Sequence, residues 1–217
     1  TKKIIRSLTR RELLKYFRKV YVPSNMIVAA TGHLHPDRIR DMVGERFASM
    51  KGSSETVDEN IPLAHRLLKV RHKENLEQTH ICMGTVCPAI TSNQRFAAVT
   101  LSTILGGGLS SRLFQRIREK HGLAYNIYSS LSMHHDAGVL LIYSATGRST
   151  ARKVVDLIVE ECSRIRRESV GVDELHRAKE NIKGSLVLSL ESSSNRMMQM
   201  AQHEIFFHRQ YAIEEVL

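Results

Sequence analysis

The segment from Leu105 to Tyr125, LGGGLSSRLFQRIREKHGLAY, constrains the fold of this 217-residue chain more than any other stretch. It begins with a glycine triplet, which permits backbone angles that a side chain would forbid. The serine pair Ser110–Ser111 predicts a helix start, because hydroxyl oxygens accept bonds from the free N–H groups of the first turn. Gly122 predicts the end of that helix. We therefore expect a loop, a short basic helix and a strand in close succession.

The predicted basic helix places two polar side chains near each other. Leu113, Phe114 and Ile117 form its apolar face, and the other positions are mostly basic or polar. Arg118 then lies at the helix end, while Tyr125 opens the next strand. These two residues should lie close enough to act together.

The same segment resembles the second domain of the zinc peptidases that include pitrilysin, insulin-degrading enzyme and mitochondrial processing peptidase. Those domains combine a glycine-rich loop, a helix similar to SSRLFQRIRE and a strand entered through a GLAY-like sequence. Their functional Arg is followed seven residues later by a Tyr, and these positions hold Arg118 and Tyr125 here. A second stretch, Thr9 to Phe47, resembles the closing portion of the family's first domain.

The resemblance implies a substrate-binding role for five residues. Arg118 and Tyr125 would hold the substrate backbone, since a guanidinium and a phenol can donate to a carbonyl oxygen that gains negative charge. The glycine loop would lie near the substrate through three residues, Gly106, Gly107 and Gly108. Without the resemblance, the pair is a solvated arginine and a half-buried tyrosine, and the glycines provide a turn with close packing. A phosphate-binding loop is disfavoured, because neither GxxxxGK[ST] nor GxGxxG is present.

No zinc-binding motif of the family occurs in this sequence. Family catalysis requires HxxEH on a helix and a distal Glu, because two histidines one turn apart face the same metal. His203-Glu204 comes closest, but the next histidine, His208, is five positions from His203 and does not share its helical face. We expect no catalytic residue and no metal ligand here. Zinc would be bound by the intact parent protein or by a partner subunit.

The fold class expected is α+β, an antiparallel-rich sheet covered by helices, as the processing-peptidase-like metallohydrolase fold implies. Residues 1–50 would be the tail of the first, catalytic-type domain. Residues 51–62 are polar and rich in Ser and acids, which favours a linker. Residues 63–217 would form the second, substrate-gripping domain, truncated before its last strand.

Hydrophobic periodicity predicts the individual elements. Helices are expected at 10–20, 38–50, 94–105, 110–120, 150–168 and 195–208, with another beginning at 172. Strands are expected at 26–31, 67–72, 78–87, 125–133 and 137–145, the last two forming a hairpin. The strand at 26–31 lacks its own sheet. We expect it to fill the vacant edge of the second domain's sheet, within one chain or between two chains as a homodimer.

Cysteine usage and hydropathy bear on the compartment. Cys82, Cys87 and Cys162 are interpreted as small, buried, reduced residues, which favours a reducing, cytoplasmic location. No apolar run approaches the roughly 20 residues that a membrane helix needs. The resemblance to a part of a larger protein leaves the compartment of that protein unknown.

The net charge of +10 raises a second class of function. Residues 1–50 carry eleven Lys or Arg against four acids. Nucleic acid is one partner for such a basic chain, but no recognised binding motif is present. A solvated basic helix face is favoured, and a preference for acidic substrate segments is a third reading.

The sequence thus predicts a fragment of a zinc-dependent endopeptidase that degrades or processes extended peptides. This part would contribute substrate binding and the closing half-shell, and would be inactive alone. Two alternatives remain: a non-catalytic Arg/Tyr partner subunit of a heteromeric peptidase, and a basic nucleic-acid-binding protein.

Overall fold

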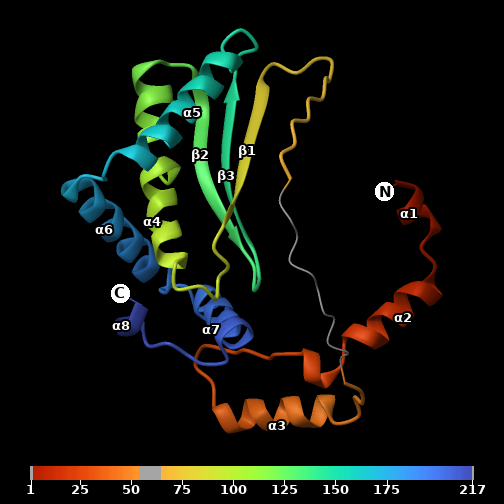
Figure 1. The fold of residues 1–217 in the computed structure, drawn as a ribbon. Coiled ribbons are helices and arrows are strands. Elements are labelled where there is room, and N and C mark those ends of the chain that lie inside the picture. Colours follow the sequence, from red (N-terminus) through yellow and green to blue (C-terminus); the bar gives the residue numbers. More distant parts are fainter. Residues whose placement is uncertain (1, 54–64, 217) are drawn as a thin grey trace. The chain divides into compact units, whose positions relative to one another are not determined.

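The computed structural model describes residues 2–53 and 65–216 (Figure 1). The chain divides into two compact units, one built from 1–60 and 189–216 and the other from 61–188. Each unit is described by itself.

The second unit contains an antiparallel sheet of three strands in the order β1-β3-β2. They are β1 (Thr79–Cys87), β2 (Ala124–Met133) and β3 (Gly138–Thr146). These strands confirm the predictions at 78–87, 125–133 and 137–145. The hairpin between β2 and β3 is also confirmed, and His134 N–H donates to Ala137 O across its turn at 2.7 Å.

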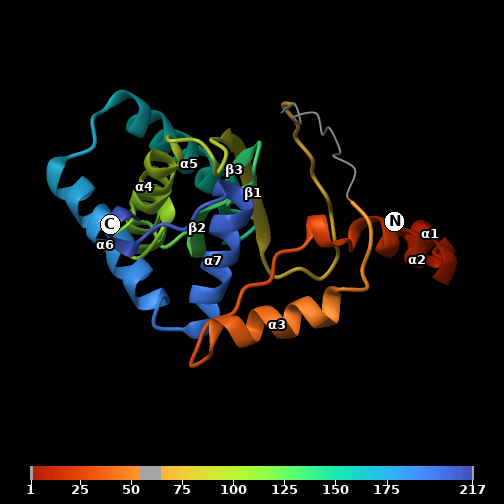
Figure 2. The ribbon, with the colours of Figure 1, turned by 90° about the horizontal axis from the view of Figure 1, so that it is seen from below.

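Helices cover one face of this sheet. α4 (Arg95–Gly106), α5 (Ala151–Arg167) and α6 (Val172–Ser189) lie on the same side of the strands in Figures 1 and 2. The core between helices and sheet consists of aliphatic side chains and one alanine, namely Leu105, Leu113, Ile117, Ala124, Ile127, Ile142, Val154, Leu157 and Ile158. The α+β class and the helical coverage are therefore confirmed for this face.

The opposite face of the sheet is open in the described part of the chain. Cys82, Tyr143 and Tyr128 stand opposite one another on β1, β3 and β2 and so share this face. Tyr128 is partly exposed, as are Val86 and Val139 of the same face. The two tyrosine rings lie 5.1 Å apart. The sheet thus presents an apolar and aromatic surface that no helix of its own unit covers.

The prediction that all three cysteines are buried is wrong for Cys82, which is exposed on the open face. Strand alternation explains the difference, because Cys82 faces away from the helices whereas its neighbours Ile81 and Met83 pack toward the core. Cys87 and Cys162 are half-buried, and all three thiols are free. Desolvation by burial raises the pKa of the Cys162 thiol.

A close approach between α4 and β2 explains the first glycine of the triplet. Ser129 Oγ donates to Ser102 O at 2.7 Å, and a Cβ at Gly106 would stand only 2.4 Å from Ser129 N. None of the three triplet glycines has a positive φ, so the expectation of unusual backbone angles is wrong, whereas the expectation of close packing agrees with the structure at Gly106. Close packing against β2 accounts for Gly106.

We expect Gly106→Ala to lower the free energy of unfolding by about 1–3 kcal/mol, because the methyl group would meet backbone atoms that cannot move aside cheaply. Urea unfolding of the protein measures this loss. Gly184→Ala is the matched control, since its Cβ meets nothing within 4 Å in the middle of α6. That change should raise stability by about 0.4–1 kcal/mol. Equal effects of the two substitutions would contradict the packing argument.

The first unit is helical in its described part. It contains α1 (Lys2–Ser7), α2 (Arg10–Val20), the 3₁₀ turn η1 (Pro23–Asn25), α3 (Pro36–Phe47), α7 (Ser193–Phe207) and α8 (Ile213–Val216). α2 begins with the predicted motif at Thr9, whose N–H donates to Glu12 Oε2 at 2.7 Å while Glu12 N–H donates to Thr9 Oγ1 at 3.3 Å.

Two predicted strands are absent from the described residues, 26–31 and 67–72. Residues 26–31 run extended in the first unit instead, where Thr31 Oγ1 donates to Ser193 O at the start of α7 at 2.8 Å. The idea that this stretch fills the sheet edge within the same chain is therefore wrong. The apolar run has the composition of a strand, but α7 offers it no ladder of backbone donors and acceptors. A homodimer through strand edges stays a prediction, as do the assignments of 1–50 and of 63–217 to two different domains. The predicted linker at 51–62 lies mostly outside the described residues.

Candidate functional site

The basic helix of the second unit begins at Arg112 and is π-helical over η2 (Phe114–Lys120). The expected cap, in which a serine oxygen accepts a hydrogen bond from the first turn, is wrong for Ser111. Its Oγ donates to Gly108 O at 2.6 Å instead. Leu113 and Ile117 are completely buried. They fix η2 against the core, and π-helical turns of this kind are frequent at functional sites.

The helix ends as predicted at Gly122, whose φ of 60° lies in the left-handed region. Its N–H donates to Arg118 O at 3.0 Å, and Leu123 N–H donates to Ile117 O at the same distance. These two bonds turn the chain sharply from η2 into β2. The turn carries Arg118 and Tyr125 to the same place.

Tyr125 occupies a β-bulge. Ala124 pairs with Thr146 and Asn126 with Ala145, so Tyr125 is the extra residue between two successive pairs. A bulge re-aims the side chain of its extra residue. The Tyr125 side chain is accordingly 69% exposed, although its neighbour Ala124 is buried in the core.

The structure brings Arg118 and Tyr125 into contact. The guanidinium carbon of Arg118 lies 4.8 Å from the centre of the Tyr125 ring and 4.7 Å from that of Phe114. Stacking on two aromatic faces orients the planar guanidinium. The Arg118 side chain makes one ion pair in the described part of the chain, a long contact of 4.0 Å with Glu119. Most of its donors, together with the Tyr125 hydroxyl, can therefore serve a ligand.

The glycine loop follows α4 near this pair in sequence. Gly106 is buried, whereas Gly107 and Gly108 are exposed and line a cavity of about 300 Å³ together with Arg177 and Asn181 of α6. A Cβ at Gly107 would stand 2.6 Å from Thr103 Cα, so this position also needs glycine for packing. Within the triplet, an added Cβ would have open space around it at Gly108 alone.

Sequence reasoning missed a buried carboxylate, Glu161 of α5, which is 1% exposed. Its Oε2 accepts from Arg116 at 3.0 Å and from Arg164 at 3.4 Å, while its Oε1 lies 3.6 Å from Arg112. The sequence places Glu161 three residues after Ile158 on the inward stripe of a periodic helix, but its burial depends on the arginines that face it. Arg112 and Arg116 are spaced one turn apart on the facing helix.

Arg112 continues this network to α6. Its Nε and Nη2 donate to the two carboxylate oxygens of Glu174 at 2.7 and 2.6 Å, a paired geometry that fixes both side chains. The hydrogen bond from Arg112 lowers the pKa of Glu174 below its usual range. The network therefore ties the helix that carries Arg118 to both α5 and α6. These residues hold the helix that carries Arg118 in place.

Within residues 2–53 and 65–216, no three His, Cys, Asp or Glu side chains lie close enough together to hold a metal ion. The described residues therefore do not fit a zinc site of their own. No helix in this part of the chain is both long enough and apolar enough to cross a membrane.

Residues 7–182 match a family model described as the Peptidase M16 inactive domain. The chain belongs to the M16 peptidase family. This confirms the resemblance on which the interpretation of the Leu105–Tyr125 segment rests. The M16 match spans both units of the structure.

Relatives of this M16 chain are named as zinc proteases. An uncharacterized zinc protease of Bacillus subtilis is 31% identical over 217 residues, covering 100% of this chain and 53% of that protein. An uncharacterized zinc protease of Mycobacterium tuberculosis is 34% identical over 216 residues, covering 97% of this chain and 49% of that protein. The chain thus spans about half the length of the curated relatives it matches.

The fold agrees with a solved M16 structure. A peptidase M16 inactive domain from Pseudomonas fluorescens superposes with a TM-score of 0.83 at 21% identity, over 98% of this chain and 51% of that one. At this identity the likeness concerns the fold alone. It agrees with the helix-covered antiparallel sheet described above.

Proposed function

We propose that this chain is the substrate-gripping, non-metal half of a zinc-dependent endopeptidase that acts on extended peptides. The observation that carries the proposal is the contact between Arg118 and Tyr125, held by a π-helical turn on one side and a β-bulge on the other. The π-helical turn and the β-bulge both depart from regular backbone geometry. The turn orients Arg118, and the bulge orients Tyr125. Such departures are expected at functional sites rather than on an ordinary surface.

The pair suits one chemical task. A peptide carbonyl oxygen gains negative charge when a nucleophile attacks its carbon, and preorganised donors stabilise that charge. Arg118 supplies a charged donor and Tyr125 a neutral one from neighbouring positions. Gly107 and Gly108 would lie along the bound peptide, with Gly106 anchoring their loop to β2.

The metal is assigned to the part of the parent protein that this chain does not contain. Zinc there would supply an activated water at neutral pH. The proposal gives this chain three tasks: binding the peptide, orienting its carbonyl and closing over it. The open, aromatic face of the sheet is the surface offered to the peptide. A cytoplasmic location, favoured by the cysteines, stays a prediction.

The test uses the intact parent protein. We expect it to bind zinc and to cleave a quenched, unstructured peptide, and to lose cleavage on chelation and regain it with added zinc. Zinc bound by the present chain alone, together with cleavage, would contradict the proposed division of labour.

The alternative is a non-catalytic Arg/Tyr subunit of a heteromeric peptidase. The names of the relatives favour the single-chain form, since they are called proteases themselves. The sequence upstream of the present chain separates the two. An HxxEH motif there supports the endopeptidase. Its absence, with activity appearing only on mixing with a second subunit, supports the partner.

A further inference from the structure

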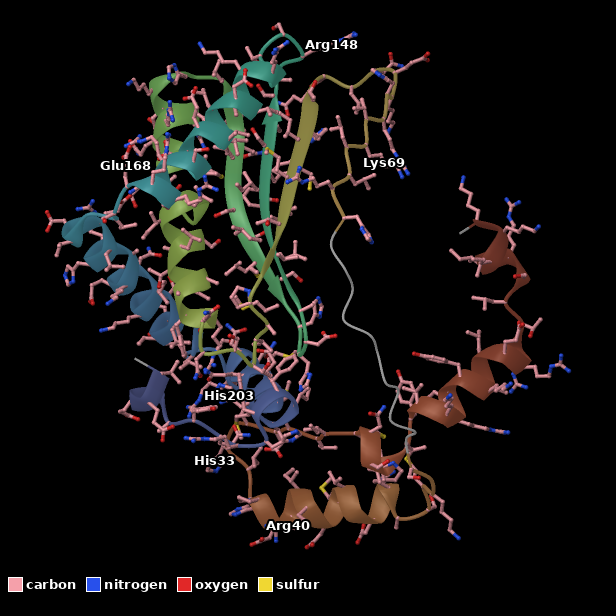
Figure 3. The ribbon with its side chains drawn as sticks, in the orientation of Figure 1. His33, Arg40, Lys69, Arg148, Glu168 and His203 are labelled. Atoms are coloured by element: carbon pink, nitrogen blue, oxygen red, sulfur yellow. The ribbon has the colours of Figure 1, made fainter. Side chains whose placement is uncertain are left out.

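A basic cleft lies beside the start of β1 in the second unit. It encloses about 610 Å³ and is lined by four cations and two imidazoles, Lys69, Arg71, Lys73, Arg148, His72 and His80. A single carboxylate, Glu77, faces them. Figure 3 labels Lys69, on the segment that precedes β1, and Arg148, on the loop between β3 and α5.

The cations of this cleft have no partners of their own in the described part of the chain. None of the four makes an ion pair or a side-chain hydrogen bond there, whereas six other arginines of the same unit do so. His80 is fixed, because its Nδ1 lies 2.8 Å from the Tyr143 hydroxyl. Gathering unpaired cations costs repulsion, and a bound anion relieves it.

The first turn of α5, next to the cleft in sequence, also carries positive charge without an acidic residue. It contains no acidic residue, and its first three residues are Ala151, Arg152 and Lys153. Cations are unfavourable at this end of a helix, where the free N–H groups are already positive. Thr150 does not offset this, because its hydroxyl donates to Gly147 O and makes no cap bond. A local arrangement that disfavours the folded helix is expected where a ligand compensates it.

The register of the sheet relates the cleft to the Arg118–Tyr125 pair. His80 on β1 and Asn126 on β2 both stand opposite Ala145 of β3. Two strand spacings therefore separate them, about 10 Å. An extended peptide covers that distance in about three residues.

We infer that the basic cleft is a subsite for an acidic side chain of the peptide substrate, a few residues away from the bond held by Arg118 and Tyr125. The occupant is a Glu or Asp carboxylate, bound by the unpaired cations of the cleft, with Arg148 and Lys69 facing it from two segments. This inference rests on the proposed function and adds a preference for acidic peptides.

The experiment compares two quenched peptides in the intact parent protein. They differ only in carrying Glu or Gln at positions three to five residues from the cleaved bond. We expect KM for the Glu peptide to be about three- to tenfold lower with kcat little changed, and the difference to shrink as salt is raised. Lys69→Glu together with Arg148→Glu should reverse the preference, and the neutral pair Lys69→Gln and Arg148→Gln should abolish it.

Arg38→Glu together with Arg40→Glu is the matched control, since this pair makes the same change of charge on exposed α3, outside the cleft. Equal loss of preference in this control, or no preference in the unmodified protein, would overturn the inference. Fluorescence anisotropy of the two peptides separates the inference from the proposed function, because it reads binding even where no cleavage occurs. Preferred binding of single-stranded DNA at the cleft, with a steep salt dependence, would assign it to nucleic acid instead.

Discussion

Replacing Arg118 by Ala in the intact parent protein is expected to lower kcat/KM for a peptide substrate by about 10²–10³-fold, the cost of removing one donor to a developing oxyanion. The guanidinium stacks on Tyr125 and Phe114 rather than pairing closely with a carboxylate, so its removal takes away donors more than structure. Arg118→Lys should recover only part of the activity, because an ammonium keeps the charge but not the planar fork.

The partner residue supplies the second half of this test. Tyr125→Phe keeps the ring under the guanidinium and removes only the hydroxyl, so the loss should fall on kcat. The two losses should combine less than additively, since the groups act on one oxygen. Arg40→Ala, on exposed α3, should leave activity unchanged. Unchanged zinc content and unfolding midpoint in the Arg118 variant would exclude a structural cause, and full activity in both variants would refute the assigned role.

The largest expected effect on stability comes from Glu161. Its removal leaves Arg112 and Arg116 without the carboxylate that lies between them, at side-chain exposures of 15% and 25%. We expect Glu161→Ala to lower the free energy of unfolding by about 3 kcal/mol, the lower end of the cost of a broken buried pair. The cost stays at this end because Arg112 keeps Glu174 and Arg116 keeps Glu160 as partners. Urea denaturation followed by circular dichroism measures the change.

The neighbouring Glu160 provides the control. It contacts the same Arg116 but its side chain is 58% exposed. Glu160→Ala should therefore cost less than about 1 kcal/mol. A Glu161 variant no less stable than the Glu160 variant would show that the network contributes nothing beyond its surface contacts.

Acid should weaken the same network through Glu174. The hydrogen bond from Arg112 holds the pKa of this carboxyl below its usual range. At pH values near the usual pKa, the group therefore binds fewer protons in the folded protein than in the unfolded one. Its stabilising contribution is fully present above the unfolded pKa and is lost as the pH falls through the lowered folded pKa.

Elements with their own periodicity were predictable from the sequence. The three strands each carry a strand-like apolar pattern, and α4, α5 and α6 each carry a helical one. These patterns predicted the elements that form the sheet and the helical layer on its covered face. The capping box at Thr9 and the helix stop at Gly122 were also predictable, because each depends on residues within four positions.

Features that depend on distant residues were not predictable in this way. Residues 26–31 have the composition of a strand, but strand formation needs a partner ladder that composition does not supply. Cys82 could not be placed because strand alternation does not say which face the helices cover. Glu161 was missed since an acid on an apolar stripe is ordinarily solvated, and only the facing arginines make its burial tolerable.

The π-helical turn has a consequence for how this site can change over time. A π turn holds one residue more than an α-helical turn would hold at the same place. Loss of a single residue between Phe114 and Lys120 would restore a regular helix and rotate the following position by about 100°, carrying its side chain away from Tyr125. The number of residues in this short segment, and not only their identity, therefore encodes the Arg118–Tyr125 contact.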